Sequence, residues 1–264
     1  MPDRLPTDRP SPARMYDYFL GGYHNFEIDR LAAQKILDIN SETPLVMQAN
    51  RAFMRRVVHF LTQQGIDQFL DIGSGIPTVG NVHEVAQKAN PESRVVYADV
   101  DSVAVRHGET ILAENPNVSI IEADLRQPEL ILNHPEVRRL LDFERPLAVL
   151  IISVLLFVPD DEAAYGAVRV LRDTVAPGSY LAITHGTHEG APPEVAQRIQ
   201  NVYANTPTPV KLRSYEEIRE FFETFELVDP GLVYVPIWRP ESSNDLYLKE
   251  PEMSVNYGGL GRKP

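Results

Sequence analysis

Residues 69–77, which read Phe-Leu-Asp-Ile-Gly-Ser-Gly-Ile-Pro, constrain the fold of this chain more than any other stretch. A short apolar run around Asp71 is followed by Gly73 and Gly75, and a helix-like spacing of apolar residues begins after Pro77. Strand, glycine turn and helix in this order form the entrance to a nucleotide-binding α/β sheet. The two glycines let the backbone turn sharply and approach a ligand closely, because neither carries a Cβ. An ordinary strand-to-helix turn has the same local pattern, so the rest of the chain must decide.

The chain beyond residue 67 alternates between strand and helix patterns. Strands are predicted at residues 68–72, 94–98, 118–122, 147–154 and 179–184. Helices are predicted between them at 78–90, 101–114, 128–141 and 160–175, and after them at 193–203 and 215–222. Strands that alternate with helices in this way imply parallel βαβ units. Two last strands, around Leu227 and at residues 232–236, are separated only by a short turn, so they are predicted to pair as an antiparallel hairpin.

The first 66 residues carry helical patterns only. Residues 1–11 are rich in proline and charge and are predicted to form a flexible tail. Helices are predicted at residues 12–20, 27–39 and 43–64. We therefore expect residues 12–66 to form a helical cover and residues 67–264 to form the α/β core, within one integrated domain.

Composition limits the classes of partner and ligand. The formal net charge is −12, so the protein should repel polyanions and acidic membranes, and neither nucleic acid nor a membrane is an expected partner. The chain has no run of the roughly 20 apolar residues that a membrane helix needs, and its N-terminus lacks the apolar segment of a secretion signal. The absence of cysteine excludes disulfides, thiolate catalysis and cysteine-ligated zinc. We expect a cytoplasmic protein, without a metal, that binds small neutral or cationic ligands.

The glycine turn departs from the pattern that binds a dinucleotide. That pattern, Gly-x-Gly-x-x-Gly, has its third glycine where this chain has Thr78, and Pro77 removes a backbone N–H from the start of the helix. Both differences weaken binding of a pyrophosphate. Asp71 would repel a phosphate but would accept a hydrogen bond from an ammonium. The turn therefore favours a sulfonium nucleoside with an amino-acid tail, which has an ammonium, a ribose diol and an adenine but no phosphate.

Acidic residues follow the second and third predicted strands. The carboxyl ends of parallel strands meet at the ligand-binding edge of such a sheet. Asp99, with its neighbour Val100, ends the second strand near the spacing from Gly75 that suits a carboxylate accepting both ribose hydroxyls. Asp101 is expected to cap the next helix.

The third and fourth strands end in residues that suit the rest of the nucleoside. Asp124 can accept from the adenine amino group while Leu125 packs on the ring, and Ser153 lies beside the expected position of the sulfonium. Any one of the acidic residues has an alternative interpretation as a helix cap or a solvated turn. Three carboxylates at three consecutive strand ends favour a binding site.

These motifs resemble those of class I S-adenosylmethionine-dependent methyltransferases. The stretch at residues 71–75, Asp99 and the Asp124-Leu125 pair are similar to the first three motifs of that fold. More specific stretches resemble a bacterial family of these enzymes that was long catalogued as a domain of unknown function: residues 12–30, 50–56, 183–185, 238–240 and 257–264. The resemblance covers nearly the whole chain.

The resemblance implies a fold, a cofactor and a binding site. The fold is a Rossmann-like α/β structure with a seven-stranded, mostly parallel, doubly wound sheet, an antiparallel last strand and an N-terminal helical cover. The cofactor is S-adenosyl-L-methionine and the product is S-adenosyl-L-homocysteine. The implied cofactor-binding residues in the core are Asp71, Gly73, Ser74, Gly75, Asp99, Val100, Asp124, Leu125 and Ser153.

The segment around the Gly-Gly pair at residues 21–22 is predicted to fold over the cofactor as a lid. We expect Arg14 and Tyr18, with their neighbour Tyr16, to help hold the methionine end of the cofactor, and Arg14 or Arg51 to pair with its carboxylate. Surface salt bridges would explain the same charged residues.

A general base helps methyl transfer when the acceptor must lose a proton, although positioning alone supplies much of the catalysis. The candidate bases are His185, just past the fifth predicted strand, His24, in the glycine loop, and Asp17. An imidazole of His185 that simply bonds a backbone carbonyl is an equally good interpretation.

The acceptor is expected to be a small molecule. The fourth strand ends Ile-Ser-Val-Leu-Leu-Phe and lacks the Asn/Asp-Pro-Pro-aromatic tetrad typical of enzymes that methylate bases or glutamine. Tyr234, Trp238 and Tyr257 would either line an acceptor pocket or pack in the core. A homodimer is compatible with the sequence.

Two other functions compete with methyl transfer. Family members often carry a histidine in the loop after the fourth strand, where this chain has Leu156. The first alternative is therefore a non-catalytic regulator that binds S-adenosylmethionine or another nucleoside. The second is a nicotinamide-dependent oxidoreductase, which Thr78 and the predicted terminal hairpin disfavour.

Overall fold

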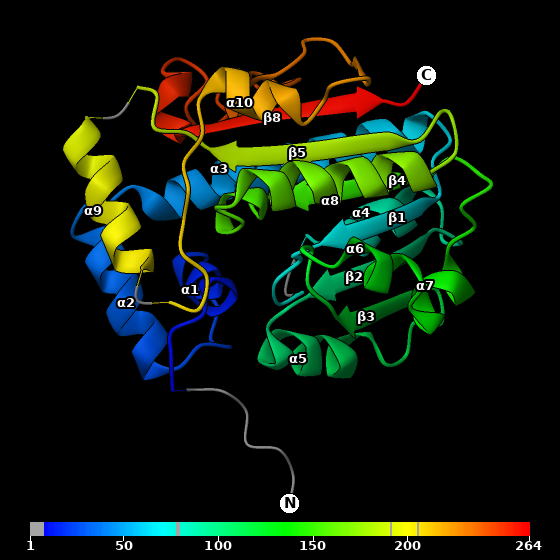
Figure 1. Ribbon diagram of the computed structural model, residues 1–264, viewed down its shortest axis with the longest axis horizontal. Coiled ribbons are helices and arrows are strands. Elements are labelled where there is room, and N and C mark those ends of the chain that lie inside the picture. Colours follow the sequence, from blue (N-terminus) through cyan, green and yellow to red (C-terminus); the bar gives the residue numbers. More distant parts are fainter. Residues whose placement is uncertain (1–7, 78–79, 191, 205) are drawn as a thin grey trace, which may run out of the picture.

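The computed structural model describes residues 8–77, 80–190, 192–204 and 206–264. One mixed sheet crosses the molecule, and helices cover both of its faces (Figure 1). The predicted α/β fold with a mostly parallel, doubly wound sheet is confirmed. Residues 1–7 of the predicted tail, and Thr78, lie outside the described residues. Within the described ranges, no helix has both the length and the apolar character needed to cross a membrane.

Five parallel strands form the centre of the sheet, and their predicted positions are confirmed to within two residues. They are β1 (Gln68–Ile72), β2 (Arg94–Asp99), β3 (Val118–Glu122), β4 (Ala148–Ile152) and β5 (Tyr180–Gly186). Their order in space is β3-β2-β1-β4-β5, so the strand order reverses between β1 and β4. Ligands of open α/β sheets bind beyond the carboxyl ends of the strands at such a switch point.

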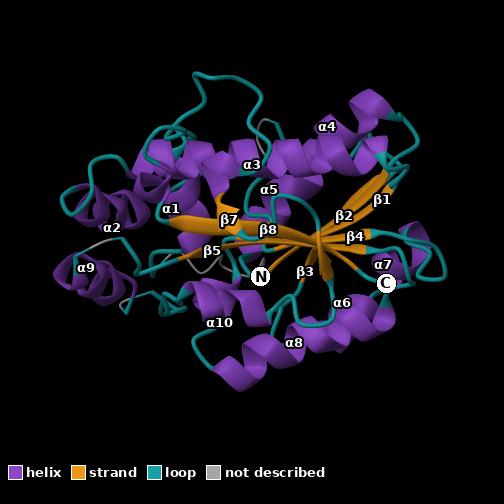
Figure 2. Cartoon of the chain, turned by 90° about the horizontal axis from the view of Figure 1, so that it is seen from above, coloured by secondary structure: helices purple, strands orange, loops and turns teal. Residues whose placement is uncertain are grey.

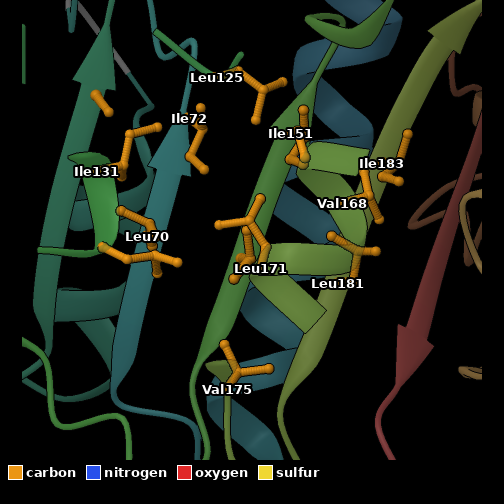
Figure 3. Packing of buried hydrophobic residues seen from close by; sticks show 14 of the residues in the cluster. Leu70, Ile72, Leu125, Ile131, Ile151, Val168, Leu171, Val175, Leu181 and Ile183 are labelled. Atoms are coloured by element: carbon orange, nitrogen blue, oxygen red, sulfur yellow. The ribbon is translucent and has the colours of Figure 1, made fainter. Parts of the chain in front are cut away.

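Two layers of helices cover the sheet (Figure 2). One face carries α3 (Thr43–Gln63), α4 (Val82–Ala89) and α5 (Ser102–Leu112), and the other carries α6 (Pro128–Leu132), α7 (Pro135–Leu140), α8 (Asp161–Thr174) and α10 (Tyr215–Glu220). Figure 3 shows apolar side chains of β1, β4 and β5 in the same buried cluster as Val168, Leu171 and Val175. Burial of one such side chain contributes about 1.5–3 kcal/mol relative to exposure. This packing fixes the strand ends relative to one another.

The antiparallel part of the sheet differs from the prediction. The strands β6 (Glu226–Leu227) and β7 (Val233–Tyr234) lie where the sequence predicts a hairpin. Each pairs with β8 (Asn256–Arg262), and in the described chain they do not pair with each other. β8 also pairs antiparallel with β5. The predicted hairpin is therefore wrong, and the sheet has eight strands.

The strand β8 is missed in the sequence because it is rich in glycine, which is depleted in strands. Its glycines are needed for close packing. A Cβ added to Gly258 would lie 2.8 Å from the ring of Phe53 on α3, and one added to Gly261 would lie 2.7 Å from Cβ of Phe225. The glycines that let β8 fit between its neighbours are therefore also the reason why the sequence does not predict a strand there.

Three further helices stand beyond the carboxyl ends of the parallel strands: α1 (Pro12–Phe19), α2 (Glu27–Leu37) and α9 (Pro193–Tyr203) (Figure 1). They share a separate apolar cluster, in which Met15, Phe19 and Ile36 are buried and Ile199 of α9 packs against them. The three N-terminal helices agree with the predicted ranges to within two residues. Short 3₁₀ segments lie at η1 (Leu155–Phe157), η2 (Val235–Ile237) and η3 (Pro251–Ser254).

Candidate functional site

A cavity lies at the carboxyl ends of β1 to β4, and residues of α1 line it. Figure 1 shows α1 beyond these strand ends. All but two of the residues predicted to hold a cofactor line its walls. These are Asp71, Gly73, Ser74, Gly75, Asp99, Val100, Asp124, Leu125 and Ser153. Further lining residues come from the helical cover: Ala13, Tyr16, Asp17, Leu20, Arg51 and Met54. The strand ends and the cover together form one site.

The glycine turn presents bare backbone to this cavity. Gly73 has a φ of 72° and Gly75 a φ of 64°, both in the left-handed region that favours glycine. A Cβ on Gly73 would lie 2.2 Å from Cγ2 of Val154, so no side chain fits there. A Cβ on Gly75 would meet nothing within 4 Å, and Gly75 lines the cavity. The turn thus leaves open space where a ligand can approach the main chain.

Asp99 is held at the end of β2 by backbone donors. The N–H of Gly75 donates to its Oδ2 at 2.7 Å, and the N–H of Asp101 donates to its Oδ1 at 2.8 Å. Burial raises the pKa of Asp99 to about 6, although these hydrogen bonds oppose the shift. Each oxygen can accept a further hydrogen bond, which suits the predicted contact with two ribose hydroxyls. Asp101 caps α5 as predicted, because its side chain accepts from Val103 and Ala104 N–H.

Asp71 is a buried carboxyl group without a hydrogen-bond donor among the described residues. It is 6% exposed. Burial raises the pKa of Asp71 to about 7, the positive charge of Arg51 opposes this shift, and Asp99 adds to it. Arg51 donates from Nη2 to Oδ1 of Asn81 at 2.7 Å and lines the same cavity. An ammonium group on a ligand would supply the donor that Asp71 lacks.

Asp124 and Leu125 follow β3 at a more open part of the cavity. The Nε of Arg126 donates to both carboxylate oxygens of Asp124, at 3.0 and 2.9 Å. Burial opposes ionisation, but the hydrogen bonds from Arg126 lower the pKa of Asp124 below its usual value. The Arg126 side chain is 52% exposed, so this ion pair is partly solvated. Asp124 keeps accepting capacity for an adenine amino group, and Leu125 is buried beside it.

Ser153 follows β4 in an unusual backbone conformation. Its φ is 56°, which is uncommon for a residue with a side chain. Its hydroxyl oxygen lies 3.2 Å from the hydroxyl oxygen of Thr184 on β5. Such conformations cluster at functional sites, and Ser153 lines the cavity next to Val154.

One face of α1 completes the site. The lining residues Ala13, Tyr16, Asp17 and Leu20 follow the i, i+3, i+4, i+7 spacing of a single helix face. Burial raises the pKa of the Tyr16 hydroxyl, which accepts a hydrogen bond from Nδ2 of Asn50 at 3.1 Å. Sequence reasoning missed Leu20, and the helical spacing was the signal that would have found it. It also missed lining residues from irregular segments, which carry no comparable pattern: Phe157, Val158 and Thr208.

Arg14 and Tyr18 are not brought to the cavity, contrary to the predicted cofactor contacts. Arg14 is 1% exposed, and its guanidinium donates to Asp29 at 2.8 Å, to Asp101 at 3.0 Å and to the carbonyl of Arg9 at 2.7 Å. Tyr18 packs with the apolar cluster of α1 and α2. Both side chains lie off the cavity-lining face of α1. Of the two arginines considered for the cofactor carboxylate, Arg51 is the one beside the cavity.

The two histidines predicted as bases also lie outside the cavity lining. His185 lies within β5 and is fully buried. Its Nδ1 is 2.7 Å from the carbonyl oxygen of Gly186, and its Nε2 is 2.9 Å from Nη1 of Arg213. Burial lowers the pKa of His185 to about 3, so the ring is neutral with both nitrogens engaged. This geometry matches the alternative interpretation of a histidine bonded to a carbonyl.

His24 packs against α5 and does not line the cavity. Its ring meets the ring of His107 on α5 edge to face, with centroids 4.6 Å apart. Its backbone N–H donates to Oδ2 of Asp17 at 2.9 Å. His24 therefore anchors the loop after α1 to the core.

The predicted acceptor-pocket aromatics and Leu156 are likewise absent from the cavity lining. Trp238 is fully buried against Phe53, and Tyr257 donates from its hydroxyl to Glu189 at 2.9 Å. Leu156 faces Gly186, where a Cβ would lie 3.7 Å from its Cδ1. The side chain at this position is therefore not part of the cavity wall.

Comparisons with known proteins agree on one family. A family model described as S-adenosyl methyltransferase matches residues 1–264. A protein from Thermobifida fusca assigned as a methyltransferase is 41% identical, with a TM-score of 0.92 over 99% of this chain and 98% of its own. A DUF574 family protein from Streptomyces avermitilis is also 41% identical, with a TM-score of 0.93 over 99% of this chain and 100% of its own.

A more distant likeness concerns the fold alone. The N-methyltransferase NodS from Bradyrhizobium japonicum, in complex with S-adenosyl-L-homocysteine, is 14% identical, with a TM-score of 0.52 over 95% of this chain and 99% of its own. No curated protein matches the chain.

Proposed function

The chain belongs to the S-adenosyl methyltransferase family, and from that premise we propose that it transfers the methyl group of S-adenosylmethionine to a small-molecule acceptor. The family supplies the reaction class and the methyl donor. The size of the acceptor and the roles of individual residues are the proposed part.

The observation that carries the proposal is that Asp71 and the open glycine turn line the same cavity. Asp71 is buried without a donor from the described chain, and Gly75 leaves open space beside it. A buried carboxylate without a partner is costly, so a cationic ligand group there is favourable. Phosphate would be repelled at the same place, which argues against a dinucleotide.

The donor set fits the cofactor group by group. Bound S-adenosylmethionine supplies an electrophilic methyl group on a sulfonium. In our proposal Asp71 accepts from its ammonium, Arg51 pairs with its carboxylate and Asp99 accepts from its ribose hydroxyls. Asp124 accepts from the adenine amino group while Leu125 and Val100 pack on the ring, and Ser153 lies near the sulfonium. Most of this catalysis is positioning, worth several powers of ten when reactants are held in line.

We further propose that residues 12–66 act as a cover on a single integrated domain, with α1 as the lid. Arg14 and His24 tie the lid to α5 rather than to the ligand, through Asp101 and His107. Leu20 and Tyr16 then exclude water from the reacting groups. The bases that the sequence offers, His185 and His24, are not needed in this scheme.

Two observations favour a small acceptor. The net charge of −12 opposes a polyanionic substrate. The acceptor must also fit beside α1 and the irregular segments that contribute Phe157 and Thr208 to the cavity. A cytoplasmic location belongs to the same proposal.

Calorimetric titration tests the donor. We expect binding of S-adenosylhomocysteine and no heat with NADH; tight NADH binding alone would overturn the proposal. Release of S-adenosylhomocysteine from S-adenosylmethionine, measured across fractions of a metabolite extract, then tests the transfer. Confirmed cofactor binding with no release in any fraction would favour the regulator instead.

A further inference from the structure

We propose that Asp17 recognises the acceptor as an amine, by placing its carboxylate against the nitrogen that receives the methyl group. The inference rests on the proposed function and names the chemical class of its acceptor. Asp17 is a buried carboxyl group on the lid, and it forms no ion pair with any described residue.

Each of the other acidic residues of the cavity has a positively charged neighbour or a proposed contact with the cofactor. Asp101 pairs with Arg14 at 3.0 Å, and Asp124 pairs with Arg126. The positive charge of Arg51 acts on Asp71, which is also the proposed partner of the ammonium. Asp99 accepts two backbone N–H groups and is the proposed partner of the ribose hydroxyls. Asp17 is 6% exposed, lines the same cavity and forms no ion pair with any described residue.

Neutral groups hold one side of the Asp17 carboxylate in place. Oδ2 accepts from the backbone N–H of His24 and from Nδ2 of Asn25, both at 2.9 Å. Oδ1 accepts nothing from the described chain. It lies over Gly22, where a Cβ would come within 2.0 Å of it, so the glycine makes room for the carboxylate.

His107, whose pKa responds to the charge of Asp17, does not neutralise this carboxylate. Burial and the neighbouring His24 lower the pKa of His107 below its usual value, although Asp17 and Asp101 oppose this. His107 is therefore neutral near pH 7. A buried carboxylate that is held by neutral donors and forms no ion pair costs free energy unless a ligand supplies the opposite charge.

Methyl transfer to an amine supplies that charge where Asp17 needs it. The lone pair of a neutral amine nitrogen forms the N–C bond to the methyl group while the C–S bond breaks, and the bonding pair stays on sulfur as a thioether. The positive charge thereby moves from sulfur to nitrogen. A carboxylate beside the nitrogen stabilises the transition state more than the ground state. The product ammonium then loses its proton to water.

Sinefungin provides a defined probe, because it carries a protonated amine where the donor carries its methyl group. The experiment compares dissociation constants for sinefungin, S-adenosylhomocysteine and S-adenosylmethionine in the full-length wild type and in Asp17→Asn. The asparagine carbonyl can still accept from His24 and Asn25, so the loop is preserved. We expect the preference for sinefungin over S-adenosylhomocysteine to fall about tenfold or more, as for loss of one charged hydrogen bond. S-adenosylhomocysteine affinity itself should change by less than about threefold.

The matched control is Asp29→Asn, which removes a lid carboxylate outside the cavity. Asp29 accepts from Ser11 N–H, Arg14 Nε and Phe26 N–H, so its loss loosens the lid without changing the charge of the cavity. This variant should weaken all three ligands by the same factor.

Three outcomes would overturn the inference. Equal losses for all ligands in Asp17→Asn would mean that the residue only shapes the lid. An unchanged sinefungin preference would mean that its charge does not reach the acceptor side. An equal loss of preference for S-adenosylmethionine would assign the carboxylate to the sulfonium. Failure of the wild type to bind S-adenosylhomocysteine would instead refute the proposed function itself.

Discussion

The two halves of the cavity differ in what determines the position of their side chains. The strand-end half, with Asp71 and Asp99, lies on a parallel sheet whose strands are in fixed register. The lid half, with Tyr16 and Asp17, lies on a helix of eight residues. A strand fixes both the place and the direction of its last residues, whereas a short helix gains its orientation only from docking. The first half is therefore set by local sequence and the second by tertiary contacts.

The contacts that dock the lid are polar and buried. Arg14 and Asp29 are 1% and 0% exposed, and Asp101 carries the link to the start of α5. Through Asp101, whose N–H also donates to Asp99, the lid is connected to the proposed ribose carboxylate. We therefore expect Arg14 to contribute to stability and Asp99 to contribute to ligand affinity.

The largest effect should come from Arg14→Ala. This change leaves Asp29 buried without its positive partner, and breaking a buried pair in this way costs about 3–5 kcal/mol. We expect a loss of that order in the free energy of unfolding, measured by urea denaturation. Adding Asp29→Asn should recover part of the loss, because the unpaired charge is then removed.

The opposite result would remove this difference between the two halves of the cavity. If Arg14→Ala kept its stability but lost S-adenosylhomocysteine affinity, the arginine would act on the ligand, as the sequence alone suggests. Both halves of the cavity would then be binding surfaces of one kind.

The next effect should come from Asp99→Ala on the strand-end half. Hydrogen bonds to a charged acceptor contribute about 1.5–3 kcal/mol each. Loss of the contacts to two ribose hydroxyls should weaken S-adenosylhomocysteine binding by about a hundredfold or more by calorimetry. Glu122→Ala is the matched control, because Glu122 pairs with Asp99 in register but does not line the cavity. Unchanged binding in Asp99→Ala would refute the ribose assignment.

The same difference explains which features could be predicted from sequence. Asp71, Gly75 and Asp124 were identifiable because strand ends of a βαβ sheet converge whatever the details of packing. Arg14 and Tyr18 were expected at the cofactor but do not line the cavity, because the sequence of α1 does not say which of its faces is docked. The 3.6-residue period groups them together on one face and Tyr16 with Leu20 on another, but only tertiary contacts decide which face meets the ligand.

The C-terminal strand escaped prediction for a related reason. Glycine is required at Gly258 and Gly261 of β8 because aromatic residues pack where a Cβ would lie, although glycine has a low strand propensity. His185 shows the limit in the site itself. A histidine near a strand end suggests a base, but its buried contact with Arg213 depends on a segment 28 residues further along the chain.

The pH dependence of S-adenosylhomocysteine affinity should further distinguish the strand-end half of the cavity from the lid half. Burial raises the pKa of Asp71 to about 7, so in the free protein this carboxyl is mostly protonated at pH 6 and mostly ionised at pH 8. The proposed ammonium contact needs the ionised form, so affinity should fall as the pH falls. For one group that titrates near 7, S-adenosylhomocysteine should bind about tenfold more weakly at pH 6 than at pH 8.

The control for this titration is Asp71→Asn. It should bind more weakly throughout and should show a much flatter profile between pH 6 and 8. Asp99, with a pKa of about 6, would add a further decrease only toward the acid end. If the affinity of Asp71→Asn depended on pH as steeply as that of the wild type, the titrating group would be another residue. A titratable side chain of the lid would then be the next candidate.

The smallest effect should come from Arg126→Ala, at the open edge of the strand-end half. Arg126 contacts the cavity and binds Asp124, yet half of its side chain is exposed. Exposed ion pairs contribute about 0–1 kcal/mol, so S-adenosylhomocysteine affinity should change by less than about threefold. Asp124→Ala should cost more, because it removes the acceptor for the adenine amino group and not only a neighbour of that acceptor. If Arg126→Ala instead lowered S-adenosylhomocysteine affinity tenfold or more, the guanidinium would itself contact the adenine. Binding at the strand ends would then also depend on a flexible side chain, and the two halves of the cavity would differ less than proposed.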